Sequence, residues 1–234
     1  MNNAPLFEAH GLVKCYQPNV PALSVDLILP AGKIIGLLGP NGSGKTTLLK
    51  IAAGILQPTS GTLRIAGEEI GPRTKAMVSY LPERNSLPNW MTVAEVLDYF
   101  SDLFADFDRD RAIDMLDRLQ LPANKRIQAL SKGMKEKVQL VLVMSRRARL
   151  YLLDEPIGGV DPATRDYILE TILAAHSPDS TILISTHLIA DIEQVLEEFI
   201  FIQHGNLLRY GSVAAVHEEE GRSVDSLFRE VFRC

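Results

Sequence analysis

The residues with the clearest chemical signature form a glycine-rich run, Gly-Pro-Asn-Gly-Ser-Gly-Lys-Thr-Thr, that fits the phosphate-binding pattern G-x-x-x-x-G-K-[ST]. Glycines let successive backbone N–H groups turn onto phosphate oxygens. In this pattern Lys45 neutralises the outer phosphates and the hydroxyl of Thr46 ligates Mg²⁺. An accidental run of this kind is expected in only about one chain in a hundred. The run therefore predicts a nucleoside triphosphate site formed by Gly39, Pro40, Asn41, Gly42, Ser43, Gly44, Lys45, Thr46 and Thr47.

Two predicted elements would position this loop. Residues 33–38, Lys-Ile-Ile-Gly-Leu-Leu, are short, apolar and β-branched at the centre, which is typical of a parallel strand buried on both faces. Residues 47–54 are predicted to form a helix. Its N-terminus would add roughly half a positive charge beside the phosphates.

A second group of candidate residues follows the apolar run Leu150-Tyr151-Leu152-Leu153, which is read as a strand ending in two acids. Strands of open α/β sheets present ligands at their carboxyl ends. Asp154 is predicted to hold Mg²⁺ through water, and Glu155 to polarise an attacking water as general base. Two acids at a strand end are otherwise often a solvated turn, and the phosphate loop upstream favours the functional reading.

The apolar run 181–186 is a further predicted strand, and it ends at His187. A neutral imidazole there can hydrogen-bond a γ-phosphate or an attacking water. The other histidines lack such a setting and are predicted to be surface or internally satisfied side chains: His10, His176, His204 and His217.

Residues 7–29 alternate apolar and polar positions between turn formers and predict a small antiparallel sheet. Tyr16 lies in it, and its ring could stack on an adenine. Taken alone, an aromatic residue on a strand is more often part of a core, so both readings stay open.

From about Thr92 to Arg147 the pattern becomes helical, after short predicted strands at 62–66 and 76–81. A capping box at Thr92 and Glu95 opens the first helix, with Val93, Val96, Leu97 and Phe100 on one side. The second is predicted over 108–120, with Ile113, Leu116 and Leu119 at helical spacing, and Ser131 can cap the third. These helices predict a lobe inserted into an α/β core.

The last third of the chain returns to mixed elements. Asp161-Pro162 is predicted to start a helix, with the aspartate as N-cap. Residues 198–203 and 206–210 predict a hairpin, and 223–232 an amphipathic helix. The acidic run 218–220 is most simply a solvated charge run.

Composition limits the function classes. The chain has 234 residues, 46% hydrophobic content and a net charge of −5, which suit one large core and give no global attraction to nucleic acid. The basic cluster of Arg146, Arg147 and Arg149 is better read as cations at a helix end than as a nucleic-acid patch. Two cysteines, Cys15 and Cys234, suit a reducing compartment. We expect no signal segment and no membrane span, so any membrane-spanning part would belong to another chain.

These signals, in this order, resemble the ATP-binding subunit of ABC transporters over essentially the whole chain. The family's phosphate loop matches residues 39–47, its adenine-stacking aromatic Tyr16, its Walker-B acids Asp154 and Glu155, and its switch histidine His187. Its D-loop matches Gly159-Val160-Asp161. Its signature motif, usually Leu-Ser-Gly-Gly-Gln, stands here as Leu130-Ser131-Lys132-Gly133-Met134.

The resemblance implies an α/β P-loop fold: a single ABC ATP-binding domain over 1–234, with a RecA-like core and an N-terminal antiparallel β subdomain in 1–83 and 149–234. An inserted α-helical subdomain would occupy 84–148. It also implies catalytic roles for Glu155, His187 and Lys45.

Two departures from the family pattern stand out. Lys132 and Met134 replace a glycine and a glutamine of the signature, but Ser131 and Gly133 retain the hydroxyl and N–H that would contact the γ-phosphate held by an opposite subunit. The family's Q-loop glutamine is replaced by Glu83, whose carboxylate can also ligate Mg²⁺.

The resemblance implies that two such subunits, alike or different, close head to tail over ATP and Mg²⁺ and drive a separate permease at the cytoplasmic face of the membrane, with no nucleic-acid partner. Leu87, Trp90 and Met91 are candidates for the permease docking groove, with internal packing an equal alternative. A soluble ATPase of the same fold, such as an iron–sulfur-cluster assembly factor, is the second hypothesis.

Overall fold

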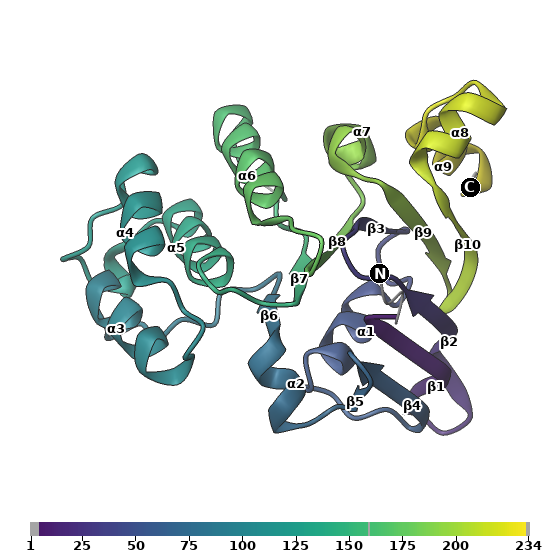
Figure 1. Cartoon of the computed structure of the whole chain (residues 1–234), viewed down its shortest axis with the longest axis horizontal. Coiled ribbons are helices and arrows are strands. Elements are labelled where there is room, and N and C mark those ends of the chain that lie inside the picture. Colours follow the sequence, from purple (N-terminus) through teal and green to yellow (C-terminus); the bar gives the residue numbers. More distant parts are fainter. Residues whose placement is uncertain (1–4, 159, 233–234) are drawn as a thin grey trace.

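The computed structural model describes residues 5–158 and 160–232, and in this part of the chain ten strands form one continuous sheet (Figure 1). The strand order is β5-β4-β1-β2-β10-β9-β3-β8-β7-β6. The strands are β1 (Phe7–Gln17), β2 (Val20–Leu29), β3 (Ile34–Leu38), β4 (Ser60–Ile65), β5 (Glu68–Glu69), β6 (Val78–Leu81), β7 (Leu150–Asp154), β8 (Thr181–Thr186), β9 (Glu198–Gln203) and β10 (Asn206–Ser212). The helices are α1 (Lys45–Ala52), α2 (Pro72–Met77), α3 (Val93–Leu103), α4 (Arg109–Arg118), α5 (Lys132–Met144), α6 (Pro162–Ala175), α7 (Ile189–Ile192), α8 (Val213–Glu220) and α9 (Val224–Val231), with 3₁₀ turns at Ile127–Ala129 and Glu193–Val195.

The sheet has a parallel half and an antiparallel half. Strands β9, β3, β8, β7 and β6 pair in parallel, while β1 pairs antiparallel with β2 and β4. The halves meet where β10 pairs with β2 through the single pair Asn206 and Ser24. The predicted antiparallel sheet at 7–29 and the hairpin of β9 and β10 are confirmed.

Alternate residues of the parallel strands pack into two apolar clusters, one on each face of the sheet. Ile34 and Leu38 of β3 join one cluster, and Ile35 and Leu37 join the other. All five residues of β3 are buried, as predicted. The first cluster also contains the inward residues of α3, α4 and α5, so the helical lobe shares a core with one face of the sheet.

Two helices of the lobe begin at the predicted caps, Thr92 and Ser131, and the third begins after Asp108, the first residue of the helix predicted over 108–120. Thr92 accepts a hydrogen bond from the N–H of Glu95 and completes the capping box, Asp108 caps α4, and Ser131 caps α5. The predicted packing face of α4 is wrong at Ile113, which is exposed, because Ala112, Met115 and Leu116 form the buried stripe.

Two predicted boundaries shift. The strand predicted at 76–81 begins only at Val78, because Pro72 stands in the first turn of α2 and the chain stays helical through Met77. The helix predicted over 47–54 spans Lys45–Ala52, so Lys45 is its first residue.

Arg146 is neither a cation at the end of its helix nor part of a nucleic-acid patch, the two interpretations of the basic cluster. Its side chain is 3% exposed, too buried to meet nucleic acid. The guanidinium donates to Asp106 Oδ1 and Oδ2 at 3.0 and 3.1 Å, and to the carbonyl oxygens of Val78 and Ala76 at 2.6 and 2.7 Å. It also lies 3.9 Å from the ring centroid of Phe104. Arg146 therefore ties the helical lobe to β6 rather than neutralising the end of its own helix.

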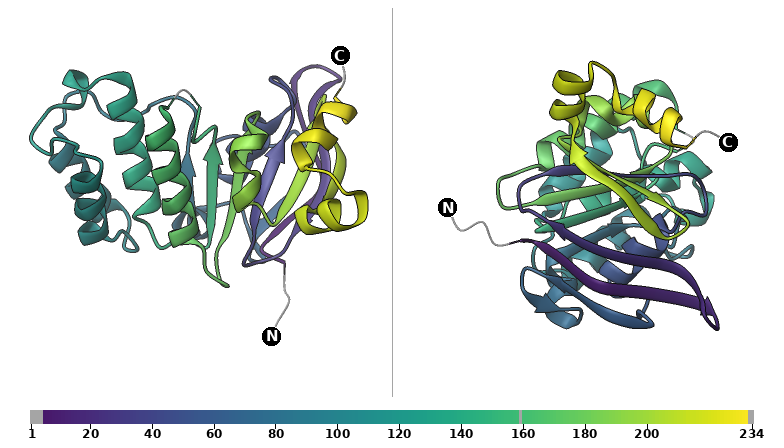
Figure 2. Two further views of the ribbon diagram at one scale, coloured as in Figure 1. Left: turned by 90° about the horizontal axis from the view of Figure 1, so that it is seen from above. Right: turned by 90° about the vertical axis from the view of Figure 1, so that its right-hand side faces the viewer.

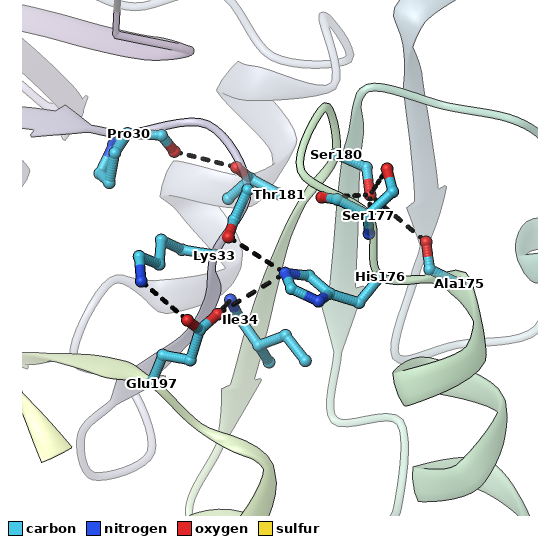
Figure 3. Close-up of polar contacts among 10 residues, drawn as sticks. Pro30, Lys33, Ile34, Ala175, His176, Ser177, Ser180, Thr181 and Glu197 are labelled. Atoms are coloured by element: carbon cyan, nitrogen blue, oxygen red, sulfur yellow. Dashed lines mark hydrogen bonds and ion pairs between the residues drawn. The ribbon is translucent and has the colours of Figure 1, made fainter. Parts of the chain in front are cut away.

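At the N-terminal edge of the parallel strands, polar side chains join loops that are far apart in sequence (Figure 3). Glu197 accepts hydrogen bonds from Lys33 Nζ at 2.8 Å and from the N–H of Ile34 at 3.0 Å. His176, at the end of α6, has Nε2 at 3.1 Å from the carbonyl of Gly32. The predicted satisfied role of His176 is thus confirmed, and this edge of the sheet holds no part of the predicted site.

Helices α8 and α9 lie at the end of the molecule opposite to α3, α4 and α5 (Figure 2). Glu193 anchors them, because its carboxylate accepts hydrogen bonds from the N–H groups of Val224 and Asp225 at the start of α9. Its Oε1 also lies 2.7 Å from His217 Nε2. The acidic run 218–220 is not wholly solvated, since Glu220 pairs with Arg209 and Arg222.

Candidate functional site

The glycine-rich run forms a loop from the end of β3 to the first residue of α1. Gly42 and Gly44 have φ angles of 79° and 107°, which favour glycine. A Cβ on Gly39 would lie 2.2 Å from the carbonyl oxygen of Ile202, so the loop passes too close to β9 for a larger residue. The N–H of Gly205 donates to the Ser43 carbonyl at 2.9 Å and holds the loop from the β9–β10 turn.

A hollow of about 410 Å³ opens over this loop and brings together most of the predicted site. It lies at the carboxyl ends of the parallel strands, where an open α/β sheet presents ligands. The predicted site residues that line it are Tyr16, Asn41, Gly42, Ser43, Gly44, Lys45, Thr46, Thr47, Glu83, Glu155 and His187.

Lys45 is turned onto its own loop. Its Nζ donates to the carbonyl oxygens of Gly39 at 2.7 Å and Pro40 at 3.2 Å. Burial lowers the pKa of this ammonium group, while the nearby carboxylates of Glu155, Asp154 and Glu83 oppose that effect. A buried cation with only carbonyl partners suits a polyanion, which would restore the charge that burial disfavours.

Asp154 is buried at the end of β7. Its Oδ1 accepts hydrogen bonds from the hydroxyls of Ser185, on the neighbouring strand β8, and Thr46, the latter at 3.2 Å. Its Oδ2 is buried and has no hydrogen-bond partner among the described residues. Burial raises the pKa of this carboxyl, although the bonds from Ser185 and Thr46 oppose the rise. An orphaned carboxylate oxygen beside a threonine hydroxyl fits an oxygen-seeking divalent cation.

No group of three histidine, cysteine or acidic side chains in the described part of the chain is arranged to hold a metal ion by itself. Mg²⁺ usually takes one or two protein oxygens and completes its shell with water and substrate phosphates. Thr46 and Asp154, which contact each other, fit that need, and Glu83 lines the hollow together with Thr46.

Glu155 and His187 form a contact at the edge of the hollow. Glu155 Oε1 lies 3.0 Å from His187 Nδ1, and its Oε2 accepts a hydrogen bond from the Thr186 hydroxyl at 3.0 Å. Glu155 has a φ of 52°, a left-handed conformation that costs free energy for a residue with a Cβ. Its N–H donates to the Ser185 carbonyl at 2.9 Å, so contacts to β8 hold it in this conformation. The solvated-turn alternative for the two acids is therefore wrong.

Tyr16 is 62% exposed, so the core reading of this residue is wrong. Its hydroxyl lies 3.2 Å from Thr47 Oγ1, which places the ring beside the phosphate loop. An exposed aromatic ring at the rim of a polar hollow is available to stack on a base.

Ser131, Gly133 and Asp161 do not line the hollow. Ser131 and Gly133 stand at the N-terminus of α5, where open space surrounds Gly133. Asp161 caps α6 by accepting from the N–H of Thr164 at 3.0 Å. Gly159 of the D-loop match and Cys234 lie outside the described residues.

Sequence reasoning missed two groups around the site. Ser185 and Thr186 fix the two acids, and their position just before His187 on the strand paired with β7 could have revealed them. Gly205 supports the phosphate loop across more than 160 residues of sequence, and no local pattern marks it.

Comparison with known proteins agrees with this geometry. The family model described as ABC transporter matches residues 23–158, more than half of the chain. The chain belongs to the ABC transporter family. A solved structure titled "Structure of ATP binding subunit of ABC transporter" superposes with a TM-score of 0.87 at 28% identity, covering 97% of this chain and 100% of that one.

Curated relatives carry matching names. ABC transporter ATP-binding protein YtrB of Bacillus subtilis (strain 168) is 33% identical over 217 residues, which cover 92% of this chain and 74% of YtrB. An uncharacterized ABC transporter ATP-binding protein of Synechocystis is 36% identical, covering 86% of this chain but only 59% of its own length. The Nod factor export ATP-binding protein I of Ralstonia nicotianae is 31% identical, covering 90% and 68%.

By family and fold, this chain is an ATP-binding subunit of the ABC transporter type, with the α/β P-loop architecture that the resemblance implied. The iron–sulfur alternative finds no support among these relatives, which are named as transporter proteins. Within the described residues, every helix is too short or too polar to cross a bilayer.

Proposed function

We propose that this subunit hydrolyses Mg-ATP and uses the cycle to drive a transporter. The observation that carries the proposal is the single hollow lined by the phosphate loop on one side and by the Glu155–His187 contact on the other. A phosphate-binding loop alone would only hold the nucleotide. A carboxylate with an orienting partner at the same hollow supplies a base for water.

Each residue has a proposed task. The N–H groups of residues 39–47 and the ammonium group of Lys45 bind the phosphates, and Tyr16 stacks on the adenine. Thr46 and Asp154, with Glu83 beside them, would hold Mg²⁺, which when bound offsets charge on the phosphate oxygens. Glu155 accepts the proton of the attacking water, and His187 orients that carboxylate and donates to the γ-phosphate.

We further propose that two nucleotide-binding subunits close head to tail. In each copy Ser131 and Gly133, at the N-terminus of α5, would contact the γ-phosphate held by the other copy, and Asp161 would lie at the same junction. The open space around Gly133 supports this role, as does the absence of these residues from their own chain's hollow. ATP would favour the closed pair because it binds that state more tightly.

A groove of about 770 Å³ between β6 and the helical lobe supports a permease partner. Its lining is mostly apolar and includes Leu87, Leu103 and Phe104, while Ile55 and Leu103 expose large apolar surfaces at its rim. The three residues predicted for docking have different surroundings. Leu87 lines the groove, and Met91 packs against the apolar core. Trp90 is 67% exposed and does not line the groove. A permease docked here would hold the subunit at the cytoplasmic face of the membrane.

Glu155→Gln tests the chemistry. Loss of the general base should lower the ATP turnover number by about 10² to 10⁴, near 3 to 5 kcal/mol of barrier, while ATP binding persists. Size-exclusion chromatography with ATP should show an ATP-dependent dimer of this variant. Hydrolysis at the wild-type rate would remove Glu155 from the proposed role.

Affinity purification from solubilised membranes tests the transporter assignment. We expect the tagged chain to recover a membrane-spanning protein, and Leu103→Glu, in the apolar groove, to abolish that recovery without loss of ATP binding. Recovery of soluble partners alone would refute the assignment.

A further inference from the structure

Two short loops carry the proposed water chemistry, and each runs directly into a helix. The chain from Glu155 to Asp161 leads into α6, and the chain from Thr186 to His187 leads into α7. Both helices contribute to the same apolar cluster, on the same face of the sheet (Figure 1).

One ion pair joins the first turns of these helices. Arg165 Nη1 lies 2.6 Å from Asp191 Oδ2, and their side chains are 26% and 32% exposed. Arg165 is four residues after Asp161, whose carbonyl accepts its N–H at 3.0 Å. Asp191 is four residues after His187. Each partner is thus four residues along the chain from a residue of the proposed site.

Helix α7 depends on such contacts for its position. It has four residues, far fewer than an isolated helix needs for stability in water. Ile189 and Ile192 anchor it by burial, and Glu193, directly after it, is anchored to α9. The Asp191 ion pair supplies the contact toward α6. The Nε of Arg165 is buried and has no hydrogen-bond partner among the described residues, so an unsatisfied donor on the same guanidinium offsets part of the free energy that the ion pair contributes.

We infer that Arg165 and Asp191 are positioning residues, which hold α7 against α6 so that His187 Nδ1 stays within hydrogen-bond reach of Glu155. The expected effect on ATP hydrolysis rests on the proposed function, whereas the expected effect on the position of His187 does not. Neither residue of the ion pair lines the hollow, so its loss should alter the Glu155–His187 contact while the phosphate loop keeps most of its contacts to the nucleotide.

The test uses the full chain with Arg165→Gln, Asp191→Asn, Arg165→Lys and the reversed pair Arg165→Asp with Asp191→Arg. Arg209→Gln is the matched control, since it breaks a part-buried ion pair with Glu220, and neither residue of that pair lines the hollow. The first readout is the NMR signal of the His187 imidazole without nucleotide, assigned with His187→Gln. We expect this signal to move in the two neutral variants and to stay in place in the control.

The second readout is steady-state ATPase kinetics. The neutral variants should lose roughly tenfold to hundredfold in kcat, because a small misplacement of a catalytic group has that effect, with ATP affinity within about threefold of wild type. Arg165→Lys or the reversed pair should recover most of the loss. An unmoved His187 signal with unchanged kcat would overturn the inference, as would equal losses in the lysine and glutamine variants. If the His187 signal moves in the neutral variants but the wild-type protein hydrolyses no ATP, the result would support the positioning role and refute the proposed function.

Discussion

Removing the buried guanidinium of Arg146 is the sharpest test of how the helical lobe is held. Arg146→Ala deletes four hydrogen bonds, two to Asp106 and two to carbonyl oxygens of the chain entering β6. It also removes the cation from the face of Phe104. Asp106 keeps a quarter of its side chain exposed, so water compensates it in part, but the carbonyls lose donors inside the protein.

Breaking a buried ion pair by removing one partner costs about 3 to 5 kcal/mol. This is a large fraction of a total stability of about 5 to 15 kcal/mol, and for a domain of this size it lowers Tm by roughly 6 to 20 °C. Arg146→Lys should recover less than half, because one ammonium group cannot serve the carboxylate and both carbonyls in the geometry of the guanidinium.

Urea unfolding followed by circular dichroism and by the fluorescence of Trp90, the chain's single tryptophan, measures the loss. The two signals should shift together, because the lobe shares its apolar core with the sheet. Arg147→Ala is the matched control: this neighbouring guanidinium is 76% exposed and pairs with Asp108, so solvent screens the pair and its loss should cost far less stability than the loss of Arg146. Equal costs for both alanine variants would refute the assignment of Arg146 as the tie between lobe and core.

Three further predictions concern the exposed ring of Tyr16, the space around two glycines, and the ion pair at the N-terminal edge of the parallel strands. Tyr16→Ala should weaken ATP affinity without lowering Tm, because the ring is exposed, while Tyr16→Phe should keep most of the affinity in a fluorescent-nucleotide titration; a lower Tm with unchanged affinity would contradict this. Gly39→Ala should disrupt the loop and its nucleotide binding, since the new Cβ would meet the Ile202 carbonyl, whereas Gly133→Ala should fold normally and weaken only the ATP-dependent dimer of Glu155→Gln; equal thermal losses in the two would refute the difference in space. Although burial alone acts to raise it, hydrogen bonds from Lys33 and the N–H of Ile34 hold the pKa of Glu197 below its ordinary 4.5. The ionised carboxylate therefore stabilises the fold fully above about pH 4.5, and this stabilisation is lost as pH falls through the lowered pKa. The difference in unfolding free energy between wild type and Glu197→Gln should shrink from pH 7 to pH 3. A difference that stays constant with pH would show that the contact contributes nothing.

The parts of the site that lie in local sequence were predictable. The loop of residues 39–47, the acids at the end of β7 and the caps at Thr92 and Ser131 each depend on residues a few positions apart, so spacing alone revealed them. Parallel strands place their carboxyl ends on one edge of a sheet, which is why His187 could be expected near Glu155.

The parts set by tertiary contacts were not predictable. The exposure of Tyr16 depends on which strand faces reach the core, and an isolated strand pattern leaves that open. Arg146 looked like a surface cation because its partners, Asp106 and the carbonyls of Ala76 and Val78, come from elements 40 to 70 residues away. The start of β6 was misplaced because the helix formers before it extend α2 to Met77.

The turn between β9 and β10 has an unusual consequence for how this chain tolerates change. Connections between antiparallel strands ordinarily accept inserted residues, because they run over the surface. Here the backbone of Gly205 touches Ser43 above and Ser24 beside it, with hydrogen bonds of 2.9 and 2.7 Å, and a Cβ on it would lie 2.6 Å from the Ala22 carbonyl. Lengthening this hairpin by even one residue would displace the phosphate loop that rests on it. A turn that looks peripheral in sequence should therefore tolerate insertions as poorly as the buried core does.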